Sequence, residues 1–256
     1  MKPVTLATGL LLCGVLASAF GEPVSAASAS ALVESMRAAR QSDGFEMRVM
    51  LQPSGGGDAV RIALIGQLRD GRERLLVRGI APAYIRGRSV VSERFGDRVE
   101  STSYDPGSSA GASRADPLAP LFGSALSAWD LMAPWWQWPV QVDDGPRTIS
   151  GHACTQVRSR PDRREASAVA EAISCVDAPN GLVWKTTLLD SRHRVLRSIE
   201  VTRVLRTQAG RSTARSASIT DADGAVTRLD VYGGDEHYEI RPETFEAPAS
   251  PVPAKV

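Results

Sequence analysis

The sequence predicts a mainly β protein built as a strongly curled antiparallel sheet, with two helical segments that are candidates to cover its concave face. From residue 45 onward, apolar and polar residues alternate with a period of two in many short segments. Tight turns separate successive segments, which favours antiparallel pairing. Two stretches of helical periodicity interrupt this order. A sheet of about ten strands is long enough to curl, so its concave face must be filled by helices, by a ligand or by both.

The N-terminus has the order of a secretory signal peptide. Lys2 precedes an apolar run over residues 4–16, and Ala17, Ser18 and Ala19 supply the small residues that signal peptidase reads. The run is short for a helix that spans a bilayer, so an uncleaved anchor is the weaker interpretation. We expect residues 1–19 to be removed, with a later cut within residues 25–29 as the alternative, and the mature chain to reach the periplasm.

The mature chain is interpreted as one domain over residues 28–246. Residues at helical spacing predict a helix over residues 30–40: Leu32, Val33, Met36 and Ala39. Alternation then predicts strands at residues 45–52, 60–64, 74–78, 89–94 and 98–104. Residues 247–256 contain three prolines and no core pattern, so we expect a disordered Pro-rich tail.

The middle of the chain changes character twice. Residues 105–117 are rich in Gly, Ser, Ala and Asp, which predicts a mobile loop. Helical spacing returns over residues 118–132, and Pro134 should end that helix. Beyond Val140 we place strands at residues 147–149, 152–159, 171–177, 182–189, 195–206, 214–220, 225–231 and 237–240.

Two cysteines remain after the signal peptide, Cys154 and Cys175. In an oxidising compartment an even pair indicates a disulfide. The predicted strands that carry them flank a polar loop, and folding this hairpin near residue 164 brings Cys154 opposite Cys175. We predict a structural disulfide, because no C-x-x-C spacing indicates a redox-active pair.

Short motifs then follow one another along residues 32–246. They are Leu76-Val77-Arg78-Gly79-Ile80-Ala81-Pro82, Ile85-Arg86-Gly87-Arg88, Gly123-Ser124 with Asp130-Leu131, and Tyr238-Glu239-Ile240. Together they resemble the outer membrane lipoprotein-sorting group of LolA-like periplasmic proteins. The resemblance implies an incomplete β-barrel covered by helices, and carriage of a lipid or lipoprotein acyl chain or service beside a lipid-exporting transporter. Where such relatives show a basic cluster after an aromatic residue and a proline, this chain has only Arg114 after Tyr104-Asp105-Pro106.

An acyl-chain carrier needs an apolar cavity. We expect the strands to line it with Phe45, Met47, Val49, Leu51, Ile62 and Leu64. We expect the helices to cover it with Leu32, Met36, Phe122, Leu126 and Trp129. The alternative is that all these side chains pack against one another as a closed core.

Two further groups are candidates for a lip or a partner surface. Trp135, Trp136 and Trp138 lie with Trp129 within ten residues, which indicates either a packed corner or a boundary that touches ligand, membrane or partner. Arg86 and Arg88 flank Gly87 and are candidates for contact with lipid phosphate or with acidic groups, while ordinary surface arginines are the alternative.

Other function classes find little support. The formal net charge of +1 does not favour nucleic-acid binding. The three histidines lack zinc-site spacing, and no nucleophile elbow occurs, so we expect no enzyme, no catalytic residue, no metal and no cofactor. Asp221 and Asp223 resemble part of a calcium loop but fit a turn better, since the remaining ligands are missing.

The sequence therefore predicts periplasmic binding of lipid or lipoprotein acyl chains, for transport or sorting toward the outer membrane. An inner-membrane transporter or an outer-membrane acceptor is the candidate protein partner. The alternative function is an envelope protein-interaction module, such as a stress sensor or an accessory to a lipid-exporting transporter, without a lipid ligand.

Overall fold

One antiparallel sheet contains every strand of the computed structural model, which describes residues 29–246 except 41, 70, 108–110, 163–167, 207–209 and 211. The predicted signal peptide and Pro-rich tail lie outside the described residues. The first strands are β1 (Ser42–Pro53), β2 (Val60–Arg69), β3 (Arg72–Ala81), β4 (Ser89–Phe95), β5 (Arg98–Tyr104) and β6 (Ala112–Ala115). The later strands are β7 (Val140–Ile149), β8 (His152–Arg160), β9 (Glu171–Asp177), β10 (Leu182–Leu189), β11 (Val195–Arg206), β12 (Ser212–Asp221) and β13 (Val226–Asp235).

The described helices are few and short. Two are α-helices, α1 (Ala29–Ala39) and α2 (Ala128–Met132). Four are single turns of 3₁₀-helix: η1 (Ala83–Ile85), η2 (Leu121–Gly123), η3 (Pro134–Gln137) and η4 (Pro242–Phe245). The helix predicted over residues 30–40 is confirmed as α1, which begins one residue earlier than expected.

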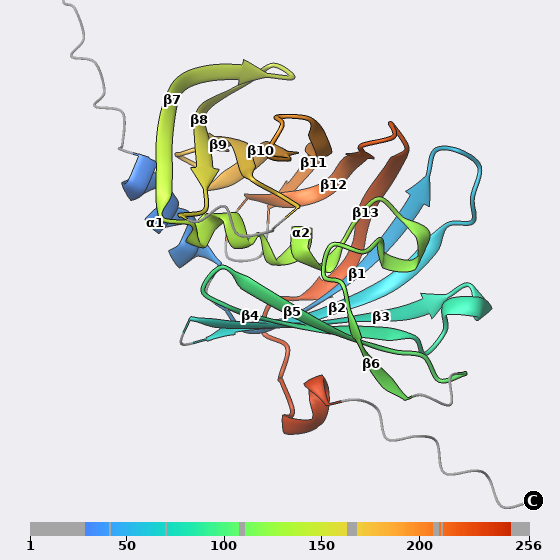
Figure 1. Cartoon of the computed structure of the whole chain (residues 1–256). Coiled ribbons are helices and arrows are strands. Elements are labelled where there is room, and N and C mark those ends of the chain that lie inside the picture. Colours follow the sequence, from blue (N-terminus) through green and yellow to red (C-terminus); the bar gives the residue numbers. More distant parts are fainter. Residues whose placement is uncertain are drawn as a thin grey trace, which may run out of the picture.

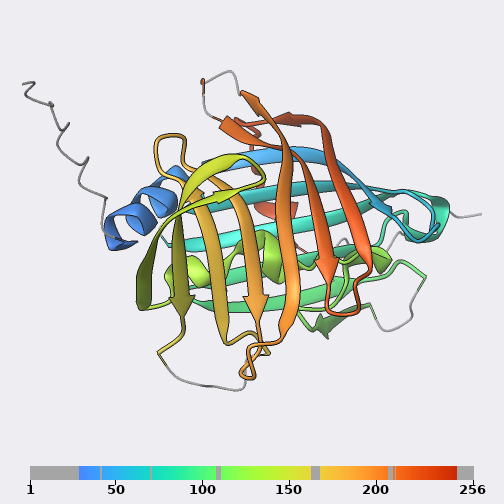
Figure 2. The same cartoon turned by 90° about the horizontal axis from the view of Figure 1, so that it is seen from above.

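The sheet curls back over itself. Its strand order is β6-β5-β4-β3-β2-β1-β13-β12-β11-β10-β9-β8-β7, and the edge strands β6 and β7 do not pair with each other. We call β1–β6 the first half and β7–β13 the second half; they join where β1 pairs with β13. In Figure 2 the strands of the second half run across those of the first half, and α2 lies between the two layers in Figure 1. The predicted antiparallel, incomplete barrel is confirmed.

Two tight turns show how local sequence fixes this sheet. Arg69 pairs with Arg72 and Phe95 pairs with Arg98, so only two residues connect the strands in each case. Gly71 and Gly96 have φ of 74° and 61°, a left-handed conformation that glycine adopts without a steric cost. Asp70 lies outside the described residues.

The helix predicted over residues 118–132 is wrong in extent. Only Ala128–Met132 is α-helical, because Phe122 and Gly123 have φ of 51° and 80° and turn the backbone before it. The Ser124 hydroxyl donates to the Leu121 carbonyl at 2.8 Å and closes this turn. A β-bridge between Pro120 and Ser127 brings the chain back to the start of α2. We call residues 117–138 the insert.

Three other predicted segments need correction. The loop expected over residues 105–117 contains β6, which pairs with β5. The strand expected at residues 147–149 begins at Val140, because a bulge between Asp143 and Pro146 bends β7 without ending it. Residues 237–240 are not a strand: the chain turns after β13, where the His237 N–H donates to the Asp235 carboxylate at 2.9 Å.

Candidate functional site

The first apolar cluster lines the first half of the sheet. It consists of buried side chains from β1, β2, β3, β12, η1 and the insert: Val49, Leu51, Val60, Ile62, Leu64, Leu75, Val77, Ile85, Leu121, Ala125, Leu126, Met132 and Ile219. Phe45, Met47 and Phe122 are half-buried and pack against it. The structure thus brings together all six predicted lining residues with two of the predicted cover residues, and they contact one another.

The second apolar cluster lies between α1, the insert and β8–β10. It consists of Ala29, Leu32, Val33, Met36, Trp129, Ala133, Trp135, Trp136, Trp138, Val157, Val169, Ala172, Val176 and Leu188. The predicted cover residues Leu32, Met36 and Trp129 therefore belong to a different cluster from the predicted lining. Half-buried Val99 packs against both clusters.

The tryptophans form the centre of this second cluster. The Trp129 ring centroid lies 5.2 Å from that of Trp135 and 6.1 Å from that of Trp138. Trp135, Trp136 and Trp138 are each 3% exposed. The packed-corner alternative therefore describes them, and they form no surface in this conformation.

The insert separates the inner faces of the two halves. Leu121, Leu126 and Met132 face the first cluster, whereas Trp129 and Trp135 face the second. The insert runs between the two layers (Figure 1) and contributes to both clusters, while Ile219 of β12 also packs directly in the first cluster. The expected helical cover is present only as α1 and the five residues of α2, with irregular backbone making up the rest of the insert.

A buried ion pair ties the insert to the second half of the sheet. The Arg197 guanidinium, on β11, forms an ion pair with the Asp130 carboxylate of α2 and donates to the Ser127 hydroxyl at 2.9 Å. Asp130 also completes a capping box, because the Ser127 N–H donates to its Oδ2 at 2.8 Å. The side chains are 12% and 0% exposed, so the pair is shielded from water.

This ion pair is incompletely hydrogen-bonded. Asp130 Oδ1 and Arg197 Nε are buried without a hydrogen-bond partner among the described residues. Burial raises the pKa of Asp130 above its ordinary value, against the opposing charge of Arg197. Since breaking a buried pair leaves an uncompensated charge, the contact holds the insert in place although its polar groups are only partly satisfied.

A second polar group holds the other end of α2. The Arg40 guanidinium donates to the Glu73 carboxylate at 2.7 Å and to the Leu131 and Met132 carbonyls at 3.2 and 3.3 Å. Glu73 also accepts from Arg94 Nε at 2.9 Å, and both of these side chains are buried on neighbouring strands of the first half. The insert is therefore fastened to both halves of the sheet.

Arg86 and Arg88 lie in a tight loop after β3. A Cβ on Gly79 would lie 2.2 Å from the Ile85 carbonyl oxygen, so only glycine permits this close approach. Arg88 Nε donates to Asp105 Oδ2 at 2.7 Å, as the acidic-partner alternative expected. Arg86 is exposed. Neither arginine faces the interior clusters.

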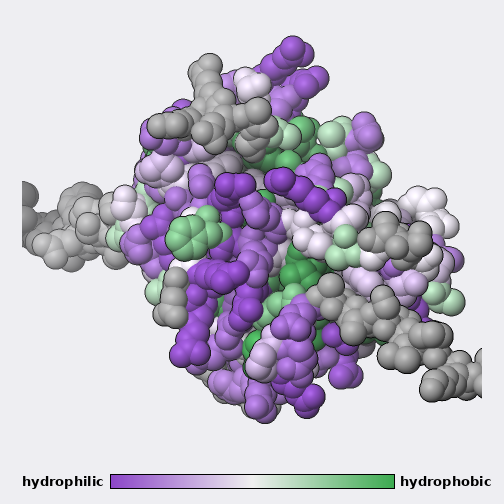
Figure 3. Space-filling model, turned by 60° about the horizontal axis from the view of Figure 1, so that its bottom comes forward, coloured by the Kyte–Doolittle hydropathy of each residue, from purple (hydrophilic) through white to green (hydrophobic). Residues whose placement is uncertain are grey.

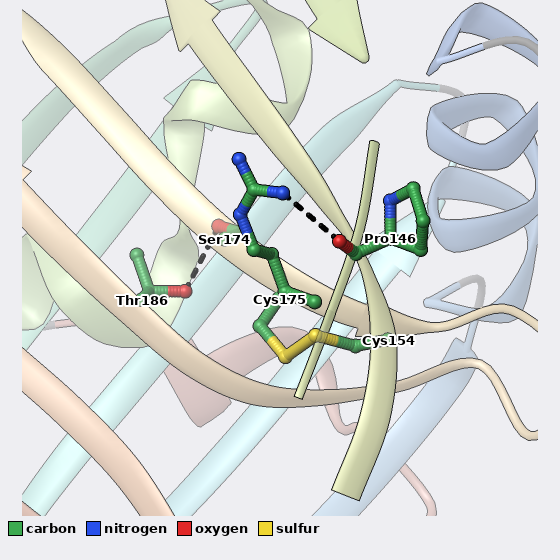
Figure 4. Close-up of a disulfide and its surroundings, with 6 residues drawn as sticks. Pro146, Cys154, Ser174, Cys175 and Thr186 are labelled. Atoms are coloured by element: carbon green, nitrogen blue, oxygen red, sulfur yellow. Dashed lines mark hydrogen bonds between the residues drawn. A yellow bond between two sulfur atoms is a disulfide. The ribbon is translucent and has the colours of Figure 1, made fainter. Parts of the chain in front are cut away.

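The predicted disulfide between Cys154 and Cys175 is confirmed, with the two Cα atoms 5.4 Å apart (Figure 4). The bond joins β8 to β9 diagonally, since Cys175 pairs in register with Gln156. A shallow hollow of about 440 Å³ lies beside it, lined by His152, Ala153, Cys154, Thr155, Val176, Asp177, Ala178, Pro179 and Trp184. His152 stacks on Trp184 at a centroid distance of 3.4 Å.

A second hollow of about 310 Å³ lies on the outer face of the first half. It is lined by Ser89, Val91, Glu93, Glu100, Thr102, Tyr104, Ala112 and Phe245. Figure 3 views the molecule from below and shows a small apolar area in a hollow that hydrophilic side chains border. Neither hollow is lined by a residue predicted to line or cover the cavity.

The described part of the chain holds no cluster of His, Cys, Asp and Glu suited to a metal ion. Asp221 and Asp223 form a turn, in which the Asp223 and Ala225 N–H groups donate to Asp221 Oδ1. None of the described helices has the length and apolar character needed to cross a membrane.

No protein-family model matches this sequence, and no curated protein matches it. Solved structures match the fold. A DUF1329 family protein from Desulfovibrio piger superposes with a TM-score of 0.76 at 15% identity, covering 85% of this chain and 95% of that one. A LolA superfamily protein from Nitrosomonas europaea gives 0.67 at 15% identity, covering 86% and 98%. The chain has the LolA-like fold.

A putative outer membrane lipoprotein-sorting protein domain from Vibrio parahaemolyticus has the same LolA-like fold, with a TM-score of 0.72 at 12% identity and coverage of 84% and 94%. The resemblance found in the sequence motifs is therefore confirmed at the level of fold. Identities this low show the fold alone, and they do not transfer the ligand of any of these proteins to this chain.

Sequence reasoning missed the Asp130–Arg197 pair. Ser127 and Asp130 have the spacing of a capping box, which is a local signal for the start of α2. Nothing local marks Arg197, because its partner lies 67 residues away in the chain. Glu73 and Arg94 were also missed, since their pairing depends on the register of β3 and β4.

Proposed function

We propose that this chain binds a long acyl chain of a lipid or lipoprotein in the bacterial periplasm, between the two halves of its sheet. The observation that carries the proposal is the position of the insert. Residues 117–138 contribute side chains to both interior apolar clusters, so displacing this segment would open an apolar trough between the two halves. The LolA-like fold and the sequence signals for export support the proposal. Binding without catalysis suffices for such a role.

The energetics favour a ligand that replaces the insert side chains. Each CH₂ group moved out of water contributes about 0.8 kcal/mol, so a long acyl chain supplies about 10 kcal/mol before ordering costs. The apolar contacts of Leu126 and Trp129 with the walls would be lost in exchange. Because the insert contains only five α-helical residues, few backbone hydrogen bonds must break when it moves.

The filled interior favours the alternative function. In the conformation described, the predicted lining is closed core, and the hollows lie elsewhere. An envelope protein-interaction module would need no trough and would keep the insert in place. The two functions therefore differ in whether lipid enters the interior.

Native mass spectrometry of the full chain, expressed with export to the periplasm, tests the proposal. We expect additional mass from bound lipid, and loss of that lipid in the Leu126→Arg and Met47→Glu variants. Phe95→Glu is the matched control, because Phe95 is 77% exposed and lies outside both clusters. Absence of lipid from the unchanged chain, both as isolated and after incubation with phospholipid vesicles, would refute lipid binding and favour the interaction module.

A further inference from the structure

The interior ion pairs differ in where their two partners are anchored. Glu73 and Arg94 both belong to strands of the first half, so they remain paired whatever the insert does. Arg197 belongs to β11, whereas its partner Asp130 belongs to the insert. Of these two interior ion pairs, movement of the insert breaks only Asp130–Arg197, because Asp130 leaves with the insert while Arg197 stays on β11.

Arg197 cannot follow the insert. It sits within the sheet, where it pairs in register with Leu188 on β10 and with Asp221 on β12. Its side chain is 12% exposed and shares the interior with Ile199, which packs against the first apolar cluster. The carboxylate of Asp221 already accepts the Asp223 and Ala225 N–H groups. A buried guanidinium that loses Asp130 is therefore left without a hydrogen-bonded counter-charge, which is unfavourable, and arginine remains charged at any relevant pH.

The guanidinium also has unused donor capacity. Its Nη1 contacts Asp130 and Ser127, both of which belong to the insert, while Nε has no partner among the described residues. Guanidinium groups bind carboxylate and phosphate oxygens through parallel N–H donors. An oxyanion that replaced Asp130 would restore the charge balance and would supply an acceptor for Nε.

From this geometry we infer that the acyl ligand carries an anionic head, a carboxylate or a phosphate, which takes the place of Asp130 on Arg197. The inference rests on the proposed function and names the class of lipid that the trough accepts. Neutral esters and glycerides would leave Arg197 unpaired inside the trough. The head would lie deep between the sheet halves, beside the start of α2, with the acyl chain along the first apolar cluster.

The test compares ligands that share one acyl chain and differ only in the head. Binding of palmitic acid, palmitoyl lysophosphatidic acid and methyl palmitate to the full chain is measured by displacement of a fluorescent fatty acid. We expect at least one of the two anionic ligands to bind about tenfold or more tightly than the ester, in line with a charge-assisted hydrogen bond. The two anionic ligands separate carboxylate from phosphate preference.

Variants on β11 and α2 assign the preference to Arg197. Arg197→Gln should bring the ratio between anionic ligand and ester close to one. Asp130→Asn should raise affinity for the anionic ligand, because it removes the competing carboxylate, so it tests the inference even if Arg197→Gln fails to fold. Arg203→Gln is the matched control, since Arg203 lies on the same strand but pairs with Asp230 and is 54% exposed.

The possible outcomes separate the two proposals. Equal binding of acid and ester by the unchanged chain would overturn the anionic head and leave acyl binding standing. A preference that survives Arg197→Gln, or an Asp130→Asn variant with unchanged affinity, would also overturn it. Binding of none of the three ligands would overturn the proposed function and this inference with it.

Discussion

The inner faces of β1–β3 in the first half and of β8–β10 in the second half carry different kinds of side chain. In the first half, aliphatic side chains on adjacent strands pack directly on one another, as Val49, Ile62 and Val77 do. On β9 and β10 of the second half, hydroxyl side chains interrupt the apolar face, since Ser174 and Thr186 hydrogen-bond to each other at 3.0 Å. The corresponding buried pair of the first half, Ser92 and Ser101 at 2.7 Å, lies farther from the centre of the sheet, on β4 and β5. Strands β8–β10 obtain their apolar contacts from α1 and the tryptophans of the insert, whereas Ile219 of β12 belongs to the first cluster.

This difference indicates which half of the sheet depends on the insert to cover its inner face. The inner face of the first half has continuous aliphatic contacts along β1–β3, so it keeps an apolar surface when the insert leaves. The inner face of the second half would expose hydroxyl groups and Arg197 when the insert leaves. Its strands β8 and β9 are additionally joined by the disulfide. We expect the first half to keep its structure when the insert moves, and the second half to change its structure when a ligand binds or the insert moves.

Removing Trp129 should have the largest effect. Its indole packs against Trp135 and Trp138 in the second cluster, so Trp129→Ala leaves a large cavity between the insert and the second half. We expect the free energy of unfolding to fall by about 4 kcal/mol. Urea denaturation followed by far-UV circular dichroism measures this change.

Two matched variants sharpen the comparison. Trp184→Ala should cost about 1.5 kcal/mol, because Trp184 lies outside the second cluster and is partly exposed while it stacks on His152. Leu51→Ala in the first half should cost about 3 kcal/mol without changing the near-UV signal of the tryptophans. Equal losses for Trp129→Ala and Trp184→Ala would contradict the central position given to Trp129.

Removing the disulfide should have the next largest effect. Cys154 and Cys175 are 21 residues apart, and a cross-link of that span is worth about 3 kcal/mol in the chain-entropy description. The Cys154→Ala, Cys175→Ala double variant should therefore lose hydrogen-exchange protection in β7–β10. Protection in β1–β3 should change little at the same denaturant concentration, and a uniform loss across both halves would show that they unfold as one unit.

The same contrast explains what the sequence could predict. Strand β1 has one mainly buried face, so the alternation at Val49 and Leu51 is a local signal that survives in the fold. Ile62 and Leu64 are buried as expected, although Ala63 and Ile65 on the other face of β2 are buried as well. The cysteine pair was predictable because two short strands and one loop fix its geometry. The same period-two pattern also predicted the antiparallel order, although it missed the short strand β6 and all but the end of the bulged strand β7.

The insert was harder to predict for a physical reason. Leu126 packs on one wall and Trp129 on the other, so apolar residues occur on both sides of the segment. A segment buried from both sides matches helical spacing without being a helix, and the positive φ at Phe122 gives no sequence signal. The pairing of Asp130 with Arg197 depends on how the whole sheet curls, which no local pattern specifies.

The smallest effect expected is on the pH dependence of stability, and it contrasts Asp190, in the turn between β10 and β11, with Asp130 of the insert. The Arg194 N–H, with the Arg194 guanidinium and the Arg192 N–H, holds the pKa of Asp190 below its ordinary value despite some desolvation. The folded state then binds fewer protons than the unfolded state. The stabilisation is complete above the ordinary pKa of about 4 and is lost as the pH falls through the folded value.

Asp130 should act with the opposite sign. Its pKa is raised by burial, so its contribution is present below the ordinary value and is lost as the pH rises through the folded value. Between about pH 6 and pH 3, Asp190→Asn should therefore flatten the acid loss of stability and Asp130→Asn should steepen it. Urea midpoints across this range measure both slopes. Changes of the same sign in the two variants would mean that the surroundings of Asp130 admit water, and the insert would then be a looser contact than its burial indicates.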